Sequence, residues 1–328
     1  MNHLSLWVML TILAFLPANS ASAQPATDYP NKPIRMVVPF APGGASDFVA
    51  RIIQPKMMEV LGQQIVIENR AGAGGNIGVE IVARSAPDGY TILLGNVGTM
   101  AINPHLYKNL QVQPMRDLIG ITAIADLPGG IALHPSVPCN TIQELIAYAK
   151  ARPGELNYGS AGVSSAQSLS FEFLIDKAGI KIQHIPYKGG AGAATIGALT
   201  GEVKIAVGTM ASFAPHIPTG KLKVIAVLAE KRLASHPNIP TLVESGFPEL
   251  TTASWQGIQV PAGTPRPIVD KLFQTMQKVV ADKGVDARFD QVSAVVIVNK
   301  SPEDHAKFWK TQSDFWGKLI KRLNIPQL

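Results

Sequence analysis

Several residue types and spacings that mark common functional classes are missing from this sequence. Cys139 is the only cysteine among 328 residues, so an internal disulfide is impossible. No histidine or acid is close enough in sequence to activate this thiol, and such a cysteine is usually buried and inert. Lysine and arginine are scattered, and no basic run alternates with the aromatic residues, which make up 6% of the chain. This distribution argues against nucleic acid as a partner.

Metal and cofactor motifs are absent as well. The seven histidines show no His-x-His or His-Glu-x-x-His spacing. No G-x-x-x-x-G-K-[ST] phosphate loop occurs, and the loop with Gly72 and Gly74 carries Ile77 where a dinucleotide site needs its third glycine. We therefore expect neither a metal nor a cofactor. We interpret the loop as a tight turn that packs a helix closely against a strand.

The N-terminal segment has no run long enough to span a membrane comfortably. The apolar stretch Leu4–Ala18 is shorter than the ~20 residues that a spanning helix needs. It is followed by Ala21-Ser22-Ala23, a small-x-small cleavage signal, although no lysine or arginine precedes it. We predict a signal peptide over 1–23 that is cleaved on export across a membrane, which releases a soluble protein. A buried N-terminal helix is the alternative.

The stretch Ile34–Arg51 organises the rest of the chain. It contains an apolar strand that ends at Pro39, a loop with Gly43 and Gly44, and a helix that opens at Ser46 or the next residue. A strand that leads through a glycine loop into a helix leaves backbone N–H groups unpaired at the positive end of the helix dipole. The pattern predicts an anion site made of backbone.

A second copy of this pattern follows about 150 residues later. Ile185-Pro186-Tyr187-Lys188-Gly189-Gly190 again reads as strand, proline, aromatic and two glycines before a helix. Two such loops predict that a small acidic ligand is held between two lobes. The net charge of +6 would help to attract an anionic ligand.

The order of the elements predicts the fold class. Apolar strands alternate with helical segments over both halves of the chain, which is typical of an α/β protein with mostly parallel, doubly wound sheets. The strands near Leu118–Leu133 and Trp255–Val260 are expected to cross between two lobes. We predict one discontinuous lobe over 28–121 and 255–328 and a second lobe over 122–254. Pro55 should kink or shorten the first helix.

Two side chains and one enzyme hypothesis stay open on sequence alone. Asp47 is either a helix cap or first-turn acid that can pair with Arg51, or a ligand contact on the wall of the cleft. Tyr187 is either core or, like Phe40 in the first loop, a wall of the cleft. The run from Gly162 to Ala166 nearly fits the G-x-S-x-G elbow, so a secreted hydrolase with Ser164 as nucleophile is the alternative to a binding protein.

The loop from Val38 to Asp47 resembles the first binding loop of the Bug family, the substrate-binding subunits of tripartite tricarboxylate transporters. Further segments over nearly the whole mature chain resemble family signatures in the same order. These are Glu68-Asn69-Arg70, Gly72-Ala73-Gly74-Gly75, Pro87-Asp88-Gly89-Tyr90-Thr91, Pro186-Tyr187-Lys188-Gly189-Gly190, Gly220-Lys221-Leu222, Pro240-Thr241 and Pro261-Ala262-Gly263-Thr264-Pro265.

The resemblance implies a two-lobed periplasmic binding protein of type II-like fold that closes on a carboxylate and is not an enzyme. Integral-membrane transporter subunits are the implied partners, with a sensor for a signalling system as the alternative, and we expect a monomer. The implied ligand-binding residues are Phe40, Ala41, Gly43, Gly44, Ala45, Ser46, Asp47, Asn96, Thr99, Ser160, Ser164, Tyr187, Gly189, Gly190, Ala191, Ala194 and Thr209.

Overall fold

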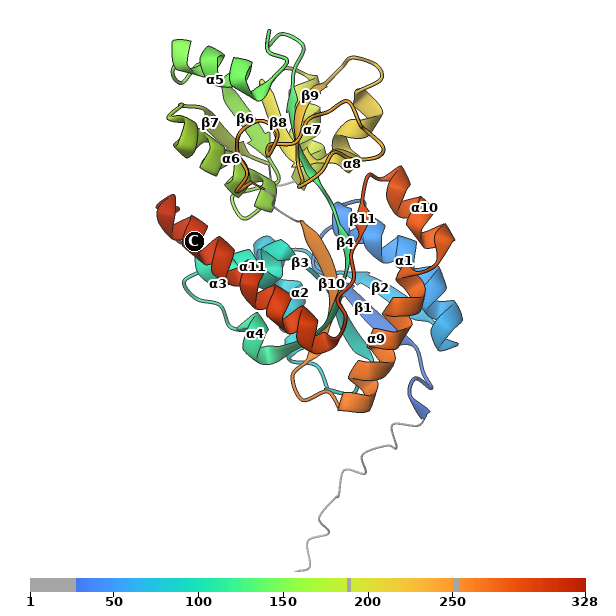
Figure 1. The fold of residues 1–328 in the computed structure, drawn as a ribbon. Coiled ribbons are helices and arrows are strands. Elements are labelled where there is room, and N and C mark those ends of the chain that lie inside the picture. Colours follow the sequence, from blue (N-terminus) through green and yellow to red (C-terminus); the bar gives the residue numbers. More distant parts are fainter. Residues whose placement is uncertain (1–27, 188–189, 251–253) are drawn as a thin grey trace, which may run out of the picture.

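The computed structural model describes residues 28–187, 190–250 and 254–328, which form two α/β lobes stacked one above the other (Figure 1). The predicted signal peptide over 1–23 lies outside the described residues. Within the described ranges, no helix has the length and apolar character to span a membrane. Each lobe contains one β-sheet covered by helices, as the sequence predicted.

The first lobe is built on a six-stranded sheet with the order β11-β4-β10-β3-β1-β2. β1 pairs in parallel with β2 and β3, and β10 lies antiparallel between β3 and β4. The strands are β1 (Ile34–Val38), β2 (Ile65–Asn69), β3 (Thr91–Asn96), β4 (Leu118–Asp126), β10 (Trp255–Pro261) and β11 (Val295–Val296).

Helices cover both faces of this sheet because the side chains of β1 alternate between two cores. Met36 and Val38 of β1 belong to the core that includes residues of α1, α9 and α10. Val37 belongs to the core that includes residues of α2 and α11. The helices are α1 (Ala45–Leu61), α2 (Asn76–Ala83), α3 (Asn103–Leu106), α4 (Pro114–Asp117), α9 (Arg266–Val280), α10 (Lys283–Gln291) and α11 (Pro302–Arg322), with short turns η2 (Ala73–Gly75) and η3 (Gly98–Ile102).

The second lobe has a five-stranded sheet with the order β7-β6-β8-β5-β9. β6 is parallel to β7 and β8, whereas β5 is antiparallel to both of its neighbours. Both sheets are therefore mixed, with a parallel three-stranded part as predicted and antiparallel strands where the chain crosses. The elements are β5 (Gly129–Leu133), α5 (Ile142–Ala151), β6 (Asn157–Ser160), α6 (Ala166–Ala178), β7 (Gln183–Pro186), α7 (Gly190–Leu199), β8 (Ile205–Thr209), α8 (Met210–Phe213), η4 (Ala214–His216) and β9 (Lys223–Leu228).

The two lobes are connected where β4 leads into β5 and where the chain returns to β10. The Leu127 N–H donates to the Ser254 carbonyl oxygen at 3.3 Å, so the two crossing segments are hydrogen-bonded to each other. β4 pairs within the first sheet as far as Asp126, a few residues past the predicted boundary at 121. The predicted domain limits otherwise stay predictions.

Pro55 does not shorten the first helix, which was one of its two predicted effects, because α1 continues through it to Leu61. Proline has no N–H, so Pro55 cannot donate to the carbonyl oxygen of Arg51 one turn earlier. Arg288 of α10 supplies the missing donor: its Nη2 lies 3.4 Å from the Arg51 carbonyl oxygen. Packing between α10 and α1 thus compensates for the lost helical bond.

Candidate functional site

The predicted site residues follow the carboxyl ends of five strands, two in the first sheet and three in the second. In open α/β sheets, ligands bind at this edge. In the first lobe the residues follow β1 and β3, and in the second lobe they follow β6, β7 and β8. The two sets face each other across the junction between the lobes (Figure 1).

Asp47 holds the loop before α1 in shape. Its carboxylate accepts hydrogen bonds from the Gly43 N–H at 2.9 Å, from Asn69 Nδ2 at 3.1 Å and from Arg51 Nε at 2.9 Å. Burial alone would raise the pKa of Asp47, but the bonds from Arg51, Gly43 and Asn69 together hold that pKa below its ordinary value. The carboxylate is directed at its own loop and pairs with Arg51, which favours the interpretation of Asp47 as a first-turn acid.

The N-terminus of α1 is left without a side-chain cap. Its N-cap residue, Gly44, has no side chain, and no side-chain cap bond occurs there. The Ser46 hydroxyl, which lies in the first turn, instead donates to Oε1 of Gln256 at 2.8 Å. The first backbone N–H groups of α1, beginning with Ala45, are therefore available for an anion.

Gln256 is a site residue that the sequence reasoning missed. It lies in β10, is 1% exposed, and binds Ser46 from the neighbouring part of the sheet. Two glutamines in an otherwise apolar buried strand, Gln256 and Gln259, were the available signal. Gln259 accepts a hydrogen bond from the Gly95 N–H at 3.0 Å and so fixes the end of β3.

The loop after β3 packs beside the aromatic wall of the first lobe. Oδ1 of Asn96 accepts the Thr99 N–H at 2.9 Å, and Thr99 is fully buried. A Cβ atom added to Gly75 would lie 3.2 Å from Cζ of Phe40 and 2.5 Å from Cγ2 of Thr99. Because Gly75 has no side chain, Phe40 and Thr99 can both pack against its backbone, as expected of a close-packing turn. Ala41 accepts a hydrogen bond from the Gly44 N–H at 3.4 Å.

The loop after β6 brings the second lobe against the first. The Gly162 N–H donates to the Ser160 hydroxyl at 3.1 Å, and the Ser165 hydroxyl caps α6 by accepting the Ser168 N–H at 3.1 Å. A Cβ atom added to Gly98 of the first lobe would lie 3.5 Å from the Ser164 carbonyl oxygen. The loops that follow β3 and β6 thus face each other at close range.

The remaining predicted residues lie in the loops after β7 and β8. The Tyr187 N–H donates to the Ser160 carbonyl oxygen at 3.0 Å, while its ring packs between two glycines, so that a Cβ atom added to Gly197 would meet Tyr187 Cζ at 2.7 Å. Of the two roles left open for Tyr187, core packing and cleft wall, these contacts favour core packing. Gly190, Ala191 and Ala194 begin α7, Thr209 lies 3.0 Å from the Ser212 hydroxyl, and Gly189 lies outside the described residues.

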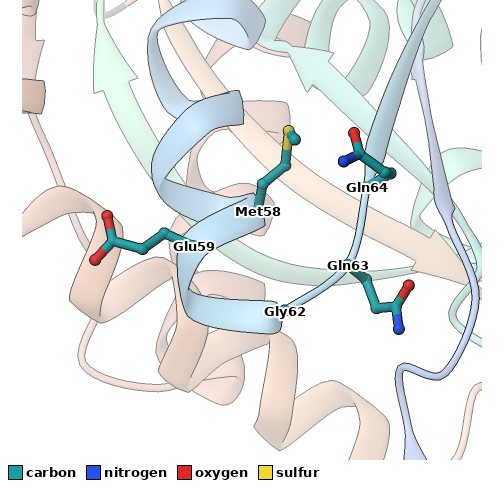
Figure 2. A pocket seen from close by; sticks show the side chains of 5 residues that line it. All are labelled: Met58, Glu59, Gly62, Gln63 and Gln64. Atoms are coloured by element: carbon teal, nitrogen blue, oxygen red, sulfur yellow. The ribbon is translucent and has the colours of Figure 1, made fainter.

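Two surface hollows elsewhere in the molecule contain none of the predicted site residues. One of about 350 Å³ lies at the C-terminal end of α1, opposite to the site, and its side chains do not converge on a common point (Figure 2). Another of about 430 Å³ lies between β4, α9 and α11. Neither is at the strand ends where the loops of the two lobes meet.

Charge at the site is nearly absent among the described residues. Among the predicted contacts that the structure describes, only Asp47 and the phenol of Tyr187 are ionisable. The charge of Asp47 is neutralised by its ion pair with Arg51. Within residues 28–187, 190–250 and 254–328 there is no cluster of three or more histidines, cysteines and acids that could hold a metal ion. The groups that the described predicted contacts offer to an anion are therefore backbone N–H groups and helix dipoles.

Residues 49–325 match the family described as Tripartite tricarboxylate transporter family receptor. The chain belongs to this family. The resemblance that the motifs indicated is confirmed, and with it the two-lobed fold of a periplasmic binding protein.

Three solved structures extend the comparison. The periplasmic binding protein BugD is 36% identical, with a TM-score of 0.83 over 92% of this chain and 100% of its own. Rpa4515 of R. palustris with adipate is 32% identical, with a TM-score of 0.86 over 92% of this chain and 100% of its own. MatC of Rhodopseudomonas palustris with bound malate is 29% identical, with a TM-score of 0.80 over 89% of this chain and 100% of its own. These neighbours are solute-binding proteins, and the chain is a solute-binding receptor of the same type.

Proposed function

We propose that this receptor captures a small carboxylate-bearing ligand between its lobes and delivers it to a tripartite tricarboxylate-type membrane transporter. The observation that carries the proposal is the uncapped start of α1, whose amides lie at the edge of the first sheet where the second lobe's loop approaches. Two neighbouring structures contain dicarboxylates, adipate and malate.

The proposed grip uses neutral donors on an ionised acceptor. Hydrogen bonds with an ionised partner are roughly twice as strong as neutral ones. Closure removes water from the carboxylate between the helix starts of the two lobes, and the ligand stabilises the closed form by its higher affinity for it. The transporter then recognises the closed shape.

Contacts between the lobes lie on both sides of the hinge. Arg322 at the end of α11 lies 3.6 Å from the Asp176 carboxylate and 4.5 Å above the Phe173 ring of α6. The Ser235 hydroxyl of the second lobe donates to the Ser293 hydroxyl at 3.4 Å. We infer that these contacts hold the lobes in register and are rearranged when the cleft opens.

We propose no catalytic role. Among the recorded hydrogen bonds of the described residues, Ser164 has none to a histidine, which leaves the hydrolase alternative without a base. The proposed location is the periplasm, after cleavage of the segment over 1–23, and the proposed state is a monomer without a cofactor.

Titration calorimetry with a panel of carboxylates, including adipate and malate, tests the function on protein refolded free of bound ligand. Ala45→Pro is the sharpest variant, because proline suits the first helical position and removes only the Ala45 N–H. A hydrogen bond to a charged group contributes about 1.5–3 kcal/mol, so Kd should rise about tenfold or more.

Lys283→Pro is the matched control. Lys283 occupies the same position in α10, where Asp282 caps the two following N–H groups and the Lys283 N–H has no role in the site. This variant should bind like the parent protein. No binding to any carboxylate in the panel would overturn the proposed function. An equal loss of affinity in Ala45→Pro and Lys283→Pro would show that the N-terminus of α1 does not bind the ligand.

A further inference from the structure

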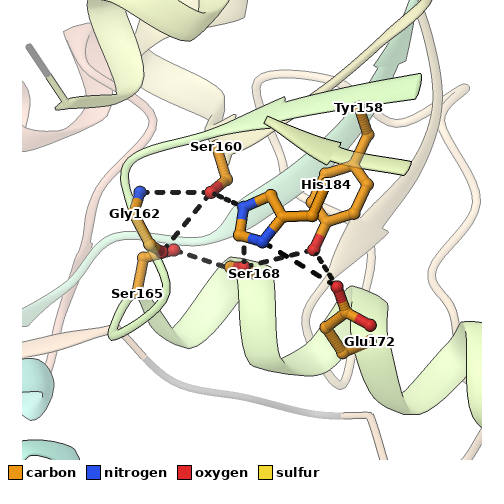
Figure 3. Close-up of polar contacts among 7 residues, drawn as sticks. All are labelled: Tyr158, Ser160, Gly162, Ser165, Ser168, Glu172 and His184. Carbon is orange, nitrogen blue, oxygen red and sulfur yellow. Dashed lines mark hydrogen bonds and ion pairs between the residues drawn. The ribbon is translucent and has the colours of Figure 1, made fainter. Parts of the chain in front are cut away.

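A connected polar network lies beneath the site loop of the second lobe (Figure 3). It joins three elements that are distant in sequence, namely β6, α6 and β7, and it ends on the Ser160–Gly162 turn. Its described members are Tyr158, Ser160, Gly162, Ser165, Ser168, Glu172 and His184.

His184 is the centre of this network. Its ring stacks on the Tyr158 ring with 4.4 Å between centroids and 1° between planes. Its Nε2 lies 2.7 Å from the Ser160 hydroxyl, and its Nδ1 lies 3.9 Å from Oε1 of Glu172. The side chain of His184 thus contacts Tyr158 and Ser160 of β6 and Ser168 and Glu172 of α6, of which Glu172 is the charged group.

The surroundings decide where the single proton of the neutral ring lies. Burial lowers the pKa of His184 to about 4, so the ring is neutral near pH 7. The Tyr158 hydroxyl donates to Oε1 of Glu172 at 2.5 Å, which marks the carboxylate as an acceptor. A proton on Nδ1 faces this carboxylate favourably, whereas a bare Nδ1 lone pair would face it unfavourably. Nε2 is then the acceptor for Ser160.

Ser160 uses its hydroxyl entirely within the protein. The hydroxyl is closer to His184 Nε2, at 2.7 Å, than to the Gly162 carbonyl oxygen, at 3.4 Å, so its proton points to the imidazole. Its oxygen accepts the Gly162 N–H, and the residue is fully buried. Gly162 has a φ of +113°, a backbone conformation that favours glycine. The hydrogen bond from the Gly162 N–H to the Ser160 hydroxyl holds the turn in this conformation.

The order of the groups is that of a serine–histidine–acid triad, but their surroundings differ. A nucleophilic serine must present its oxygen to substrate. The oxygen of Ser160 is instead buried and already accepts a backbone N–H. The chain of hydrogen bonds therefore ends on the backbone of the loop and not on a reacting atom.

We propose that His184 and Glu172 are positioning residues for ligand binding, which act through Ser160 on the loop that carries Ser164. Glu172 keeps the proton on Nδ1 of His184, His184 accepts the Ser160 hydroxyl, and Ser160 holds the Gly162 turn. The loop then presents its backbone N–H groups and Ser164 to the first lobe. This inference rests on the proposed function of the cleft.

Two substitutions at one position separate positioning from packing. His184→Phe keeps the flat ring against Tyr158 but removes the acceptor for Ser160. His184→Gln loses the stacked ring but offers a carbonyl oxygen to Ser160. Positioning predicts that His184→Phe raises the Kd for adipate or malate about five- to tenfold, in proportion to one lost hydrogen bond, and that His184→Gln stays close to the parent protein. A packing role predicts the reverse order.

His134→Phe is the matched control in the same lobe. Nδ1 of His134 lies 2.7 Å from the Ser136 hydroxyl, in a turn after β5, so it is a second histidine–serine pair away from the site. This substitution should leave the Kd unchanged.

Hydrogen exchange of the Gly162 amide gives a readout that needs no ligand. The amide should be protected in the parent and in His184→Gln, and should exchange faster in His184→Phe. Glu172→Gln, which keeps an acceptor for Tyr158 but removes the charge, should shift the ring ¹⁵N signals of His184 away from the Nδ1–H tautomer.

The outcomes separate the two proposals. If the parent binds a carboxylate and His184→Phe matches it in both Kd and exchange, the positioning role is overturned while the proposed function stands. If His184→Gln is as impaired as His184→Phe, the positioning role is also overturned, in favour of packing. If exchange changes as expected but the parent binds no carboxylate, the proposed function fails and the control of the loop by His184 is supported.

Discussion

The two helix starts that border the cleft are organised differently. The first turn of α1 has no side-chain cap, and its acid, Asp47, bonds back to the Gly43 N–H. The first turn of α6 is capped, because the Ser165 hydroxyl accepts the Ser168 N–H. One loop is fixed by an ionised carboxylate and the other by hydroxyl groups and a neutral imidazole.

This difference assigns the two lobes different parts in binding. A capped helix start has already used one of its free N–H groups, whereas an uncapped one offers them to a ligand. We therefore expect α1 to provide the stronger hold on an anion. The loop before α6 contributes mainly by approaching Gly98 and closing the site.

Removal of the carboxylate in the first loop should have the largest effect. Asp47→Ala leaves the Gly43 N–H and the Asn69 amide without their acceptor and Arg51 without its partner. Bonds to charged groups contribute about 1.5–3 kcal/mol, so ligand Kd should rise at least about tenfold and the midpoint of thermal unfolding should fall. Calorimetry and thermal unfolding measure the two effects.

Asp47→Asn is the control for this comparison. The amide oxygen can still accept the Gly43 N–H, so the loss should be clearly smaller than in Asp47→Ala. Equal binding by Asp47→Ala and the parent would show that the first loop keeps its shape without the carboxylate and would break the contrast between the lobes.

Lowering the pH should protonate one buried histidine in each lobe and so reduce the free energy of unfolding. Burial lowers the pKa of His184 and of His305 from 6.5 to about 4. The unfolded chain therefore binds more protons than the folded chain between these values, and the free energy of unfolding falls as the pH falls through this window. Each pKa unit corresponds to about 1.4 kcal/mol. Glu172, whose pKa is raised mainly by burial, opposes this slope in the second lobe.

Urea unfolding of His184→Gln and His305→Gln at pH 7 and pH 4.5 measures the contribution of each ring. Both variants should gain stability relative to the parent as the pH is lowered. His305 lies in α11, away from the cleft, and its Nδ1 is 2.8 Å from Oδ1 of Asn299. His305→Gln should therefore leave the Kd near pH 7 unchanged. A constant difference from the parent at both pH values would contradict the assignment of buried neutral rings.

The smallest effects are expected from exchanging the two helix caps. Gly44→Ser would give α1 a cap, and a serine differs from a glycine at this position by only a few tenths of a kcal/mol in stability. The added Cβ would lie 3.3 Å from the Ala41 carbonyl oxygen, so the loop has to give slightly. The new hydroxyl competes with the ligand for the same N–H groups, and Kd should rise several-fold.

Ser165→Gly is the reverse exchange in the second lobe. It should reduce stability by a few tenths of a kcal/mol without the same rise in Kd. Calorimetry on both variants measures the contrast. A greater loss of affinity in Ser165→Gly than in Gly44→Ser would mean that α6, rather than α1, provides the main hold on the anion.

Local features of the fold could be predicted well. Thr141-Ile142-Gln143-Glu144 has the sequence of a capping box, which predicts a helix over Ile142–Ala151, and α5 has these bounds. The Glu144 N–H donates to the Thr141 hydroxyl, as this motif requires. The apolar run Val292–Val298 predicts a strand, but it is paired only at Val295 and Val296. The helix Lys283–Gln291 could not be predicted from the sequence pattern. That helix is strongly polar and shows a weak apolar stripe, so its position depends on packing against α1.

Local sequence specified most of the strands, the glycine loops and most of the helix starts, because proline, glycine and the spacing of apolar residues act on near neighbours in the chain. It also determined the family. The tertiary structure decided which distant groups complete those loops: Gln256 for Ser46, Arg288 for the carbonyl oxygen that Pro55 leaves free, and His184 for Ser160. These partners lie between 24 and 237 residues away along the chain, and only the stacking of strands and helices brings them within hydrogen-bond distance.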